Sequence, residues 1–179
     1  MTARPLAFVT RRRVLQLGLG AGALALLGGG GLLWLRGAAP AIHDLKCLSP
    51  QQFRTLAAMA RTHIPAGGPF AIGADEAELA RAFDRYLADE PQEHVRDVKR
   101  ALHLVEFGPI LFDRRLTTFS HLPPADQRQH WLEWGQSDLL LRRQVWWGFA
   151  KFFGLVFYDR PEVWPHIGYP GPSLERLPA

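Results

Sequence analysis

The stretch from Val145 to Tyr158 predicts a helix that is apolar on almost every side. Its sequence, VWWGFAKFFGLVFY, contains one charged residue, Lys151. It is shorter than the roughly 20 residues that a membrane-spanning helix needs, and a helix that is apolar all round must be covered all round. We therefore expect either a helix bundle built around it or a face covered by another protein. Large aromatic side chains anchor many protein interfaces, so the candidate interface residues are Trp146, Trp147, Phe152 and Phe153.

The rest of the mature chain also predicts helices, and no segment shows the period-two alternation of a strand. Ser49-Pro50-Gln51-Gln52 is a capping box with proline at the first helical position. Other helices are expected at 79–87, after Pro91 until Gly108-Pro109, from Ala125 to Trp134, and from Asp138 to Tyr158. The fold class is therefore all-α, a small bundle of about five helices over residues 42–160.

Residues 161–179 form a tail rich in proline and glycine. Proline lacks a backbone donor and glycine favours turns, so the tail predicts an extended arm rather than a helix. Trp164, Ile167 and Tyr169 are the side chains that would attach it, with Gly168 between them. Wrapping of the chain's own domain and contact with a partner both remain open.

Residues 1–41 predict a twin-arginine export signal, which the twin-arginine translocase of bacteria would read. Thr10, Arg11, Arg12, Arg13, Val14 and Leu15 precede an uncharged, glycine-rich stretch that ends at Leu35. Ala39 and Ala41 frame an A-x-A cleavage site. Cleavage and retention as a single membrane anchor are both open outcomes, and either places the protein in the periplasm or on the outer face of the inner membrane. This route carries folded cargo, which indicates a bound cofactor or a partner subunit.

The charge and the cysteine content exclude several classes of function. Without residues 1–41 the chain has 16 basic and 17 acidic residues, so no basic patch indicates nucleic-acid binding. Cys47 is the single cysteine. It cannot form an internal disulfide, so it is either a free thiol or paired with another chain.

No motif in the sequence predicts a catalytic, metal or cofactor site. His103 and Glu106, and likewise Glu90 and His94, are spaced for one helix face, but a di-iron bundle needs two Glu-x-x-His motifs and two more glutamates. We therefore interpret these residues as solvated helix faces. Glu133 and Asp138 are acids without a partner at a useful spacing. No G-x-S-x-G or C-x-x-C-H motif occurs.

Nearly the whole chain resembles the gluconate 2-dehydrogenase subunit 3 family. The resemblance is carried by the export signal, Leu48 to Leu56, Ile64-Pro65 with Gly67-Gly68-Pro69, and Ile167 to Pro172. It implies a small subunit without a cofactor, which lends its signal to an FAD-dependent (GMC-type) sugar or alcohol dehydrogenase and stabilises it. It also implies a third, cytochrome c subunit with haem, and membrane association. In this case Arg11 and Arg12 would be the recognition pair, and Ile167, Gly168 and Tyr169 would belong to the tail.

A second hypothesis is a stand-alone protein, anchored in the membrane by its N-terminus, that binds a quinone or another redox partner. The aromatic helix is the feature that favours it.

Overall fold

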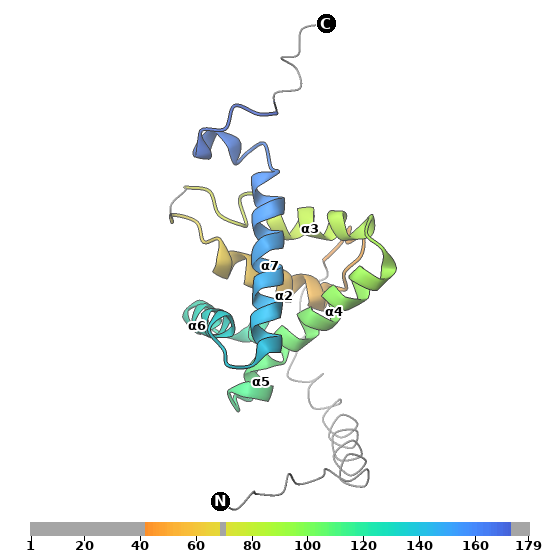
Figure 1. The fold of residues 1–179 in the computed structure, drawn as a ribbon, viewed down its shortest axis with the longest axis vertical. Helices are drawn as coiled ribbons and strands as arrows, with labels where there is room; N and C mark the ends of the chain where they lie inside the picture. Colours follow the sequence, from red (N-terminus) through yellow and green to blue (C-terminus); the bar gives the residue numbers. More distant parts are fainter. Residues whose placement is uncertain (1–41, 69–70, 173–179) are drawn as a thin grey trace, which may run out of the picture. The chain divides into compact units, whose positions relative to one another are not determined.

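The computed structural model describes residues 42–68 and 71–172. Over these ranges the chain forms α-helices, two 3₁₀ helices and no strand, which confirms the all-α expectation (Figure 1). The signal, residues 1–41, and the end of the tail, residues 173–179, lie outside the described residues. The elements are α2 (Pro50–His63), α3 (Leu79–Ala88), α4 (Gln92–Glu106), α5 (Gly108–Phe112), η1 (Phe119–His121), α6 (Pro124–Gly135), α7 (Leu140–Tyr158) and η2 (Trp164–Ile167).

Helix α2 occupies the centre of this domain. It begins at the predicted capping box: Ser49 Oγ accepts the Gln52 N–H at 3.3 Å, and Gln52 Oε1 accepts the Ser49 N–H at 2.9 Å. Leu56 and Met59 are fully buried. The helix packs against α3, α4, α6 and α7, and in Figure 1 it passes behind α7. The central helix is thus α2 and not the more apolar α7, for which a central place was one of the two outcomes expected from the sequence.

A buried carboxylate holds the segment that leads into α2. Asp84 of α3 accepts the backbone N–H groups of Lys46, Cys47 and Leu48 at 2.6, 3.1 and 2.7 Å. These three N–H groups precede the helix and therefore have no acceptor within it. The carboxylate of Asp84 accepts a hydrogen bond from each of them. This contact fixes the entry of α2 against α3.

A second buried carboxylate joins α4 to α2 and η1. Glu106 is 1 % exposed. It accepts hydrogen bonds from Gln51 Nε2 at 2.6 Å, Thr55 Oγ1 at 2.9 Å, and both the backbone N–H and the Oγ of Ser120 at 3.1 and 2.8 Å. The interpretation of Glu106 as part of a solvated face is therefore wrong. His103, in contrast, is exposed, and His94 forms an exposed ion pair with Glu90.

Gly108 and Pro109 end α4, as predicted, and α5 begins at once. Glycine is required here because a Cβ at position 108 would lie 2.7 Å from His130 Nε2 and 2.9 Å from the Trp134 ring. The close approach brings the α4–α5 junction against α6. It also places Asp113, which follows α5, next to His130.

Helix α7 lies on the outside of the bundle and is covered on one side only. Phe149, Phe153, Val156 and Phe157 are buried, and the helix packs against α6, α3 and α2. Figure 1 shows α7 in front of α2 and crossing it, with α6 to the left of α7 and α3 to its right. Of the two expectations for this stretch, a helix enclosed within its own bundle is therefore wrong for the described residues. An uncovered face remains.

The first part of the tail is more compact than expected. Residues 164–167 form η2, with Pro165 in its first turn, where a missing N–H costs nothing. Trp164 Nε1 donates to the Tyr158 carbonyl at the end of α7 at 2.9 Å, and Val163 is fully buried. The extended arm is therefore wrong for residues 161–167, because side chains of this segment fold it back onto the end of α7.

Candidate interaction surface

The outward side of α7 carries large apolar side chains that are at least half exposed. We call Leu140, Gln144, Trp147, Lys151, Leu155 and Tyr158 the α7 face. At 100° per residue these positions lie within a strip about 80° wide along the whole helix. Leu140, Trp147, Leu155 and Tyr158 are 60, 56, 57 and 50 % exposed. Four large apolar residues together on one helix face are typical of an interaction surface. Apolar residues that are scattered singly over a protein surface are not.

Two of the grooves that border α7 are lined mostly by apolar side chains. The first lies between α4 and α7, measures about 460 Å³, and is lined mostly by apolar side chains such as Val98, Phe149 and Phe152, with Asp97 at its edge. The second lies between the end of α2 and α7, measures about 350 Å³, and includes His63 and Phe157. The outer surface of α7 is therefore a ridge between two hollows.

The predicted interface residues divide between this surface and the core. Trp147 is on the α7 face, and Phe152 is half-buried in the wall of the α4–α7 groove. Trp146 is half-buried, and its ring packs against Trp131 and against Gly135. Phe153 is fully buried, with ring contacts to Phe83 and Phe149. The prediction is wrong for Phe153, because this side chain belongs to the core.

The tail residues have mainly internal contacts. The rings of Trp164 and Tyr169 meet edge to face at 5.4 Å between centroids, and Ile167 packs against the core. Gly168 has φ +68°, the left-handed conformation that ends η2. Tyr169 is 44 % exposed. Of the tail candidates, Tyr169 is therefore the large side chain that is free to meet a partner.

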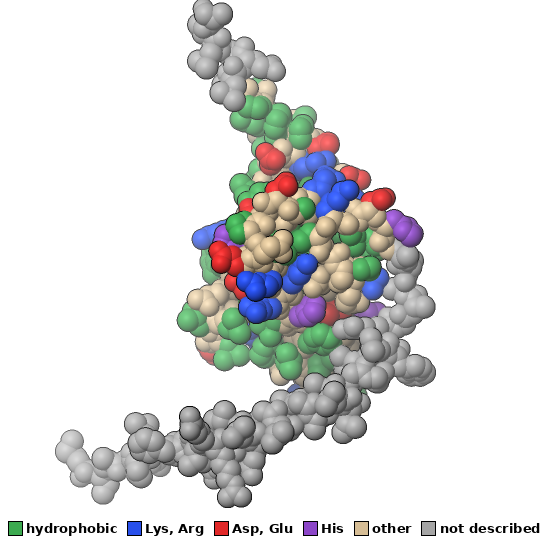
Figure 2. All heavy atoms as spheres, turned by 90° about the vertical axis from the view of Figure 1, so that its right-hand side faces the viewer, with side chains coloured by type: hydrophobic (Ala, Val, Ile, Leu, Met, Phe, Trp, Pro, Cys, Tyr) green, Lys and Arg blue, Asp and Glu red, His purple; other side chains and the backbone are tan. Residues whose placement is uncertain are grey.

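Helix α7 itself has a net positive charge. Helix α7 contains Arg142, Arg143 and Lys151 and no acidic residue. The guanidinium of Arg142 lies over the rings of Phe112 and Trp134, 4.9 and 5.2 Å from their centroids. The face beside α4, in contrast, carries basic and acidic side chains together (Figure 2).

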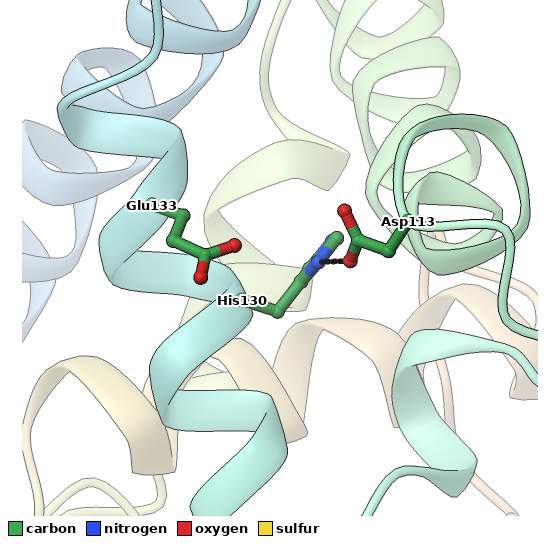
Figure 3. A group of neighbouring side chains, drawn as sticks. All are labelled: Asp113, His130 and Glu133. Carbon is green, nitrogen blue, oxygen red and sulfur yellow. Dashed lines mark hydrogen bonds and ion pairs between the residues drawn. The ribbon is translucent and has the colours of Figure 1, made fainter.

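A cluster that the sequence did not reveal lies between α5 and α6. Asp113, His130 and Glu133 each offer an atom within 4.8 Å of the others, and Figure 3 shows the His130 ring between the two carboxylates. Trp134 Nε1 donates to His130 Nε2 at 3.0 Å. The imidazole proton is therefore on Nδ1, where it faces Asp113 Oδ2 at 2.6 Å. The i,i+3 spacing of His130 and Glu133 was the available signal, but Asp113 is distant in sequence.

This cluster is arranged for hydrogen bonding rather than for a metal ion. A metal would need a lone pair of the imidazole, and one ring nitrogen already accepts the Trp134 N–H while the other donates to Asp113. Glu133 is exposed and accepts from Gln129 at 2.9 Å. The hydrogen bonds from His130 to Asp113 and from Trp134 to His130 therefore hold α6 against the α4–α5 junction.

The stability of the domain will fall as the pH drops below about 6.5, which is the pKa of a histidine side chain in an unfolded chain. Burial lowers the pKa of His130, although Asp113 opposes the shift, and burial also lowers the pKa of His63. Below 6.5 the unfolded chain gains protons that the folded chain does not take up, so acid favours unfolding. Urea unfolding between pH 7.5 and 5.5 measures this effect. His130→Gln should make the pH dependence shallower and the exposed His166→Gln should not; equal slopes in all three proteins would refute the role of His130.

The other predicted sites are placed as follows. Cys47 is half-buried beside the core, and its pairing with another chain stays a prediction. Thr10, Arg11, Arg12, Val14, Leu15, Ala39 and Ala41 lie outside the described residues. In the described part of the chain, no helix has the length and apolar character needed to cross a bilayer.

Compared with known proteins, the chain matches no family model, no curated protein and no solved structure.

Proposed function

We propose that this chain is a non-catalytic subunit that binds an FAD-dependent (GMC-type) sugar or alcohol dehydrogenase and escorts it through twin-arginine export. The observation that carries the proposal is the uncovered α7 face, with Trp147 and Leu155 more than half exposed. The export signal suggests the export route, and the resemblance to the dehydrogenase small subunits suggests the class of partner. The FAD would be held by the partner, and the electrons would pass to a cytochrome c subunit at the membrane.

The chemistry of the α7 face suits association with a folded protein. Burying apolar surface contributes about 25 cal/mol per Å², and a specific interface buries about 800 Å² on each partner. The α7 face supplies aromatic and aliphatic anchors. The grooves beside it are hollows into which side chains of a complementary partner surface could fit. A partner that covers it in the cytoplasm would also be carried by the signal of this chain.

Placing charges on the α7 face will release the partner. We expect Trp147→Asp with Leu155→Asp to weaken association at least about 30-fold, which is the effect of losing a single interface anchor of about 2 kcal/mol. Both side chains are exposed, so the helical content should be unchanged. The measurement is the amount of flavoprotein that co-purifies with the tagged chain. Leu132→Asp, on the exposed side of α6, is the matched control; equal recovery with all variants would refute this interface.

One observation favours the stand-alone alternative. His63 lines the α2–α7 groove among apolar side chains, and its Nδ1 accepts the Trp131 N–H at 3.4 Å. The proton of the neutral ring is therefore on Nε2, a donor suited to a quinone carbonyl. Quenching of tryptophan fluorescence by a short-chain ubiquinone, lost in His63→Leu, together with the absence of any co-purifying flavoprotein, would favour this function instead.

A further inference from the structure

Both tryptophans of α6 donate their indole N–H groups to histidine rings. Trp131 Nε1 donates to His63 Nδ1 at 3.4 Å, and Trp134 Nε1 donates to His130 Nε2 at 3.0 Å. The two tryptophans are fully buried, and their ring centroids are 6.3 Å apart. The first bond joins α6 to the last residue of α2. The second orients His130, which joins α6 to Asp113 after α5.

Each of these hydrogen bonds exists only while the imidazole is neutral. A ring nitrogen accepts an N–H through its lone pair, and protonation places a hydrogen on that nitrogen. In the protonated rings, Nδ1 of His63 and Nε2 of His130 would each point a hydrogen at an indole N–H. Two donors that face each other in a buried place are unfavourable. Histidine gains this proton in the range of about pH 5 to 8.

Charged groups of several elements face His130, and their effects oppose each other. The carboxylates of Asp113, after α5, and Glu133, on α6, favour the protonated ring, whereas the Arg142 guanidinium of α7 disfavours it. Element η1 contributes the uncharged Phe119 ring. Burial has the largest effect and lowers the pKa of His130. The ring therefore takes up a proton less readily than an exposed histidine does.

The surroundings of His63 are aromatic and apolar. Helices α6 and α7 contribute the rings of Trp131, Trp146 and Phe153. Of the described residues that line its groove, none is acidic, and Tyr158 is the one other that titrates, at a pH far above neutral. Burial lowers the pKa of His63. Both rings that accept an indole N–H are thus held neutral by the closed structure.

Helix α6 lies between two exposed connections. Residues 114–116 precede it and residues 138–139 follow it, and all of them are exposed. The helix is held mainly by its packing against α2 and α7. An element of this kind can open while its neighbours stay folded.

We propose that α6 is an acid-sensitive element: when His63 and His130 take up protons, α6 separates from α2, α7 and the α4–α5 junction while α2, α3 and α4 stay folded. The separation exposes Trp131 and Trp134, whose donors no longer meet acceptors on the two rings. It needs no ligand and no partner, so it is independent of the proposed function.

Hydrogen exchange of the full-length chain, read by mass spectrometry at pH 7.5 and 5.0, tests the proposal. The rates are corrected with those of the unfolded chain. A histidine that stays neutral in the closed structure and has an open-state pKa of about 6.5 favours opening by about 30-fold at pH 5.0. We therefore expect the protection of α6 amides to fall at least about tenfold. At pH 5.0 it should also be at least about tenfold lower than that of α3 and α4 amides. Equal protection of all these helices at pH 5.0 would mean that the domain opens as one unit, and would overturn the proposal.

The number of protons taken up identifies the groups that open α6. The logarithm of its opening constant should change by up to about two per pH unit in the wild type, and by about one in His63→Asn or His130→Gln. Each amide offers an oxygen near the position of the lost acceptor nitrogen. The double variant should open equally at both pH values, and the exposed His166→Gln should behave as the wild type. A pH dependence that persists in the double variant would assign the opening to other groups and refute the proposal.

Removing an indole donor tests the opposing N–H groups directly. Trp134→Phe keeps an aromatic ring, but a proton on Nε2 of His130 then meets no N–H, so the pH dependence of α6 opening should become shallower. A merely structural effect would raise the opening equally at both pH values. Trp164→Phe removes an indole N–H that bonds the Tyr158 carbonyl, and as the control it should keep the wild-type pH dependence. An unchanged pH dependence in Trp134→Phe would contradict the proposed cause.

Discussion

Replacing Arg11 and Arg12 with lysine will leave both this chain and the flavoprotein in the cytoplasm. Lysine keeps the positive charge but not the planar guanidinium with its fixed donors, so the substitution tests recognition rather than charge. The flavoprotein is expected to have no signal of its own and to depend on this one. The measurement is dehydrogenase activity and protein amount in periplasmic and cytoplasmic fractions. We expect near-complete loss of periplasmic activity.

Arg4→Lys is the control for this prediction, because Arg4 lies in the same basic segment but outside the pair. It should leave the distribution unchanged. A normal amount of periplasmic flavoprotein in the double variant would mean that the flavoprotein reaches the periplasm independently. The escort would then be excluded, even if the two proteins associate after export.

Glu106→Ala will cause the largest loss of stability among single changes in the polar residues of the domain. The side chain is 1 % exposed and accepts four hydrogen bonds. Removing it takes this acceptor from the donors of Gln51 and Ser120, which are half-buried, and of Thr55, which is buried. Hydrogen bonds to charged groups contribute about 1.5–3 kcal/mol each, with incomplete additivity, so we expect a loss of about 3 kcal/mol or more in the free energy of unfolding.

Urea unfolding followed by circular dichroism measures this loss. Glu106→Gln should lower the free energy of unfolding less than Glu106→Ala does, because the amide oxygen can still accept hydrogen bonds. Some loss should remain, because the amide nitrogen is itself a donor and faces other donors. Glu133→Ala is the matched control: its carboxylate is exposed and accepts from Gln129 on the same helix, so the change should be within about 0.5 kcal/mol. A loss below about 1 kcal/mol for Glu106→Ala would contradict the role assigned to this carboxylate.

Local signals in the sequence predicted most of the helices. The capping box at Ser49 and the break at Gly108-Pro109 depend on residues within a few positions of each other, and both are present in the structure. The exposed side of α7 could not be predicted in the same way. When almost every position is apolar, the helical period does not select an inner face, so Phe153 and Trp147 were equal candidates until the tertiary packing separated them.

The buried carboxylates were also beyond the sequence. Glu106 and His103 are spaced as on a solvated helix, and the donors that surround Glu106 come from residues 51, 55 and 120. Asp113 and His130 meet because Gly108 allows α6 to approach the α4–α5 junction. In the tail, the bond from Trp164 to the Tyr158 carbonyl overcame the extended tendency of the prolines. In each case, contacts distant in sequence decided the outcome.

The central claim is that this chain functions in a complex with a flavoprotein. The most direct measurement is to isolate the full-length chain from its own host through a tag placed after Ala179, and to record its visible absorption spectrum and subunit ratio. We predict flavin bands and a stoichiometric dehydrogenase subunit, with haem bands if the cytochrome subunit stays bound. A colourless preparation that contains this chain alone would contradict the claim.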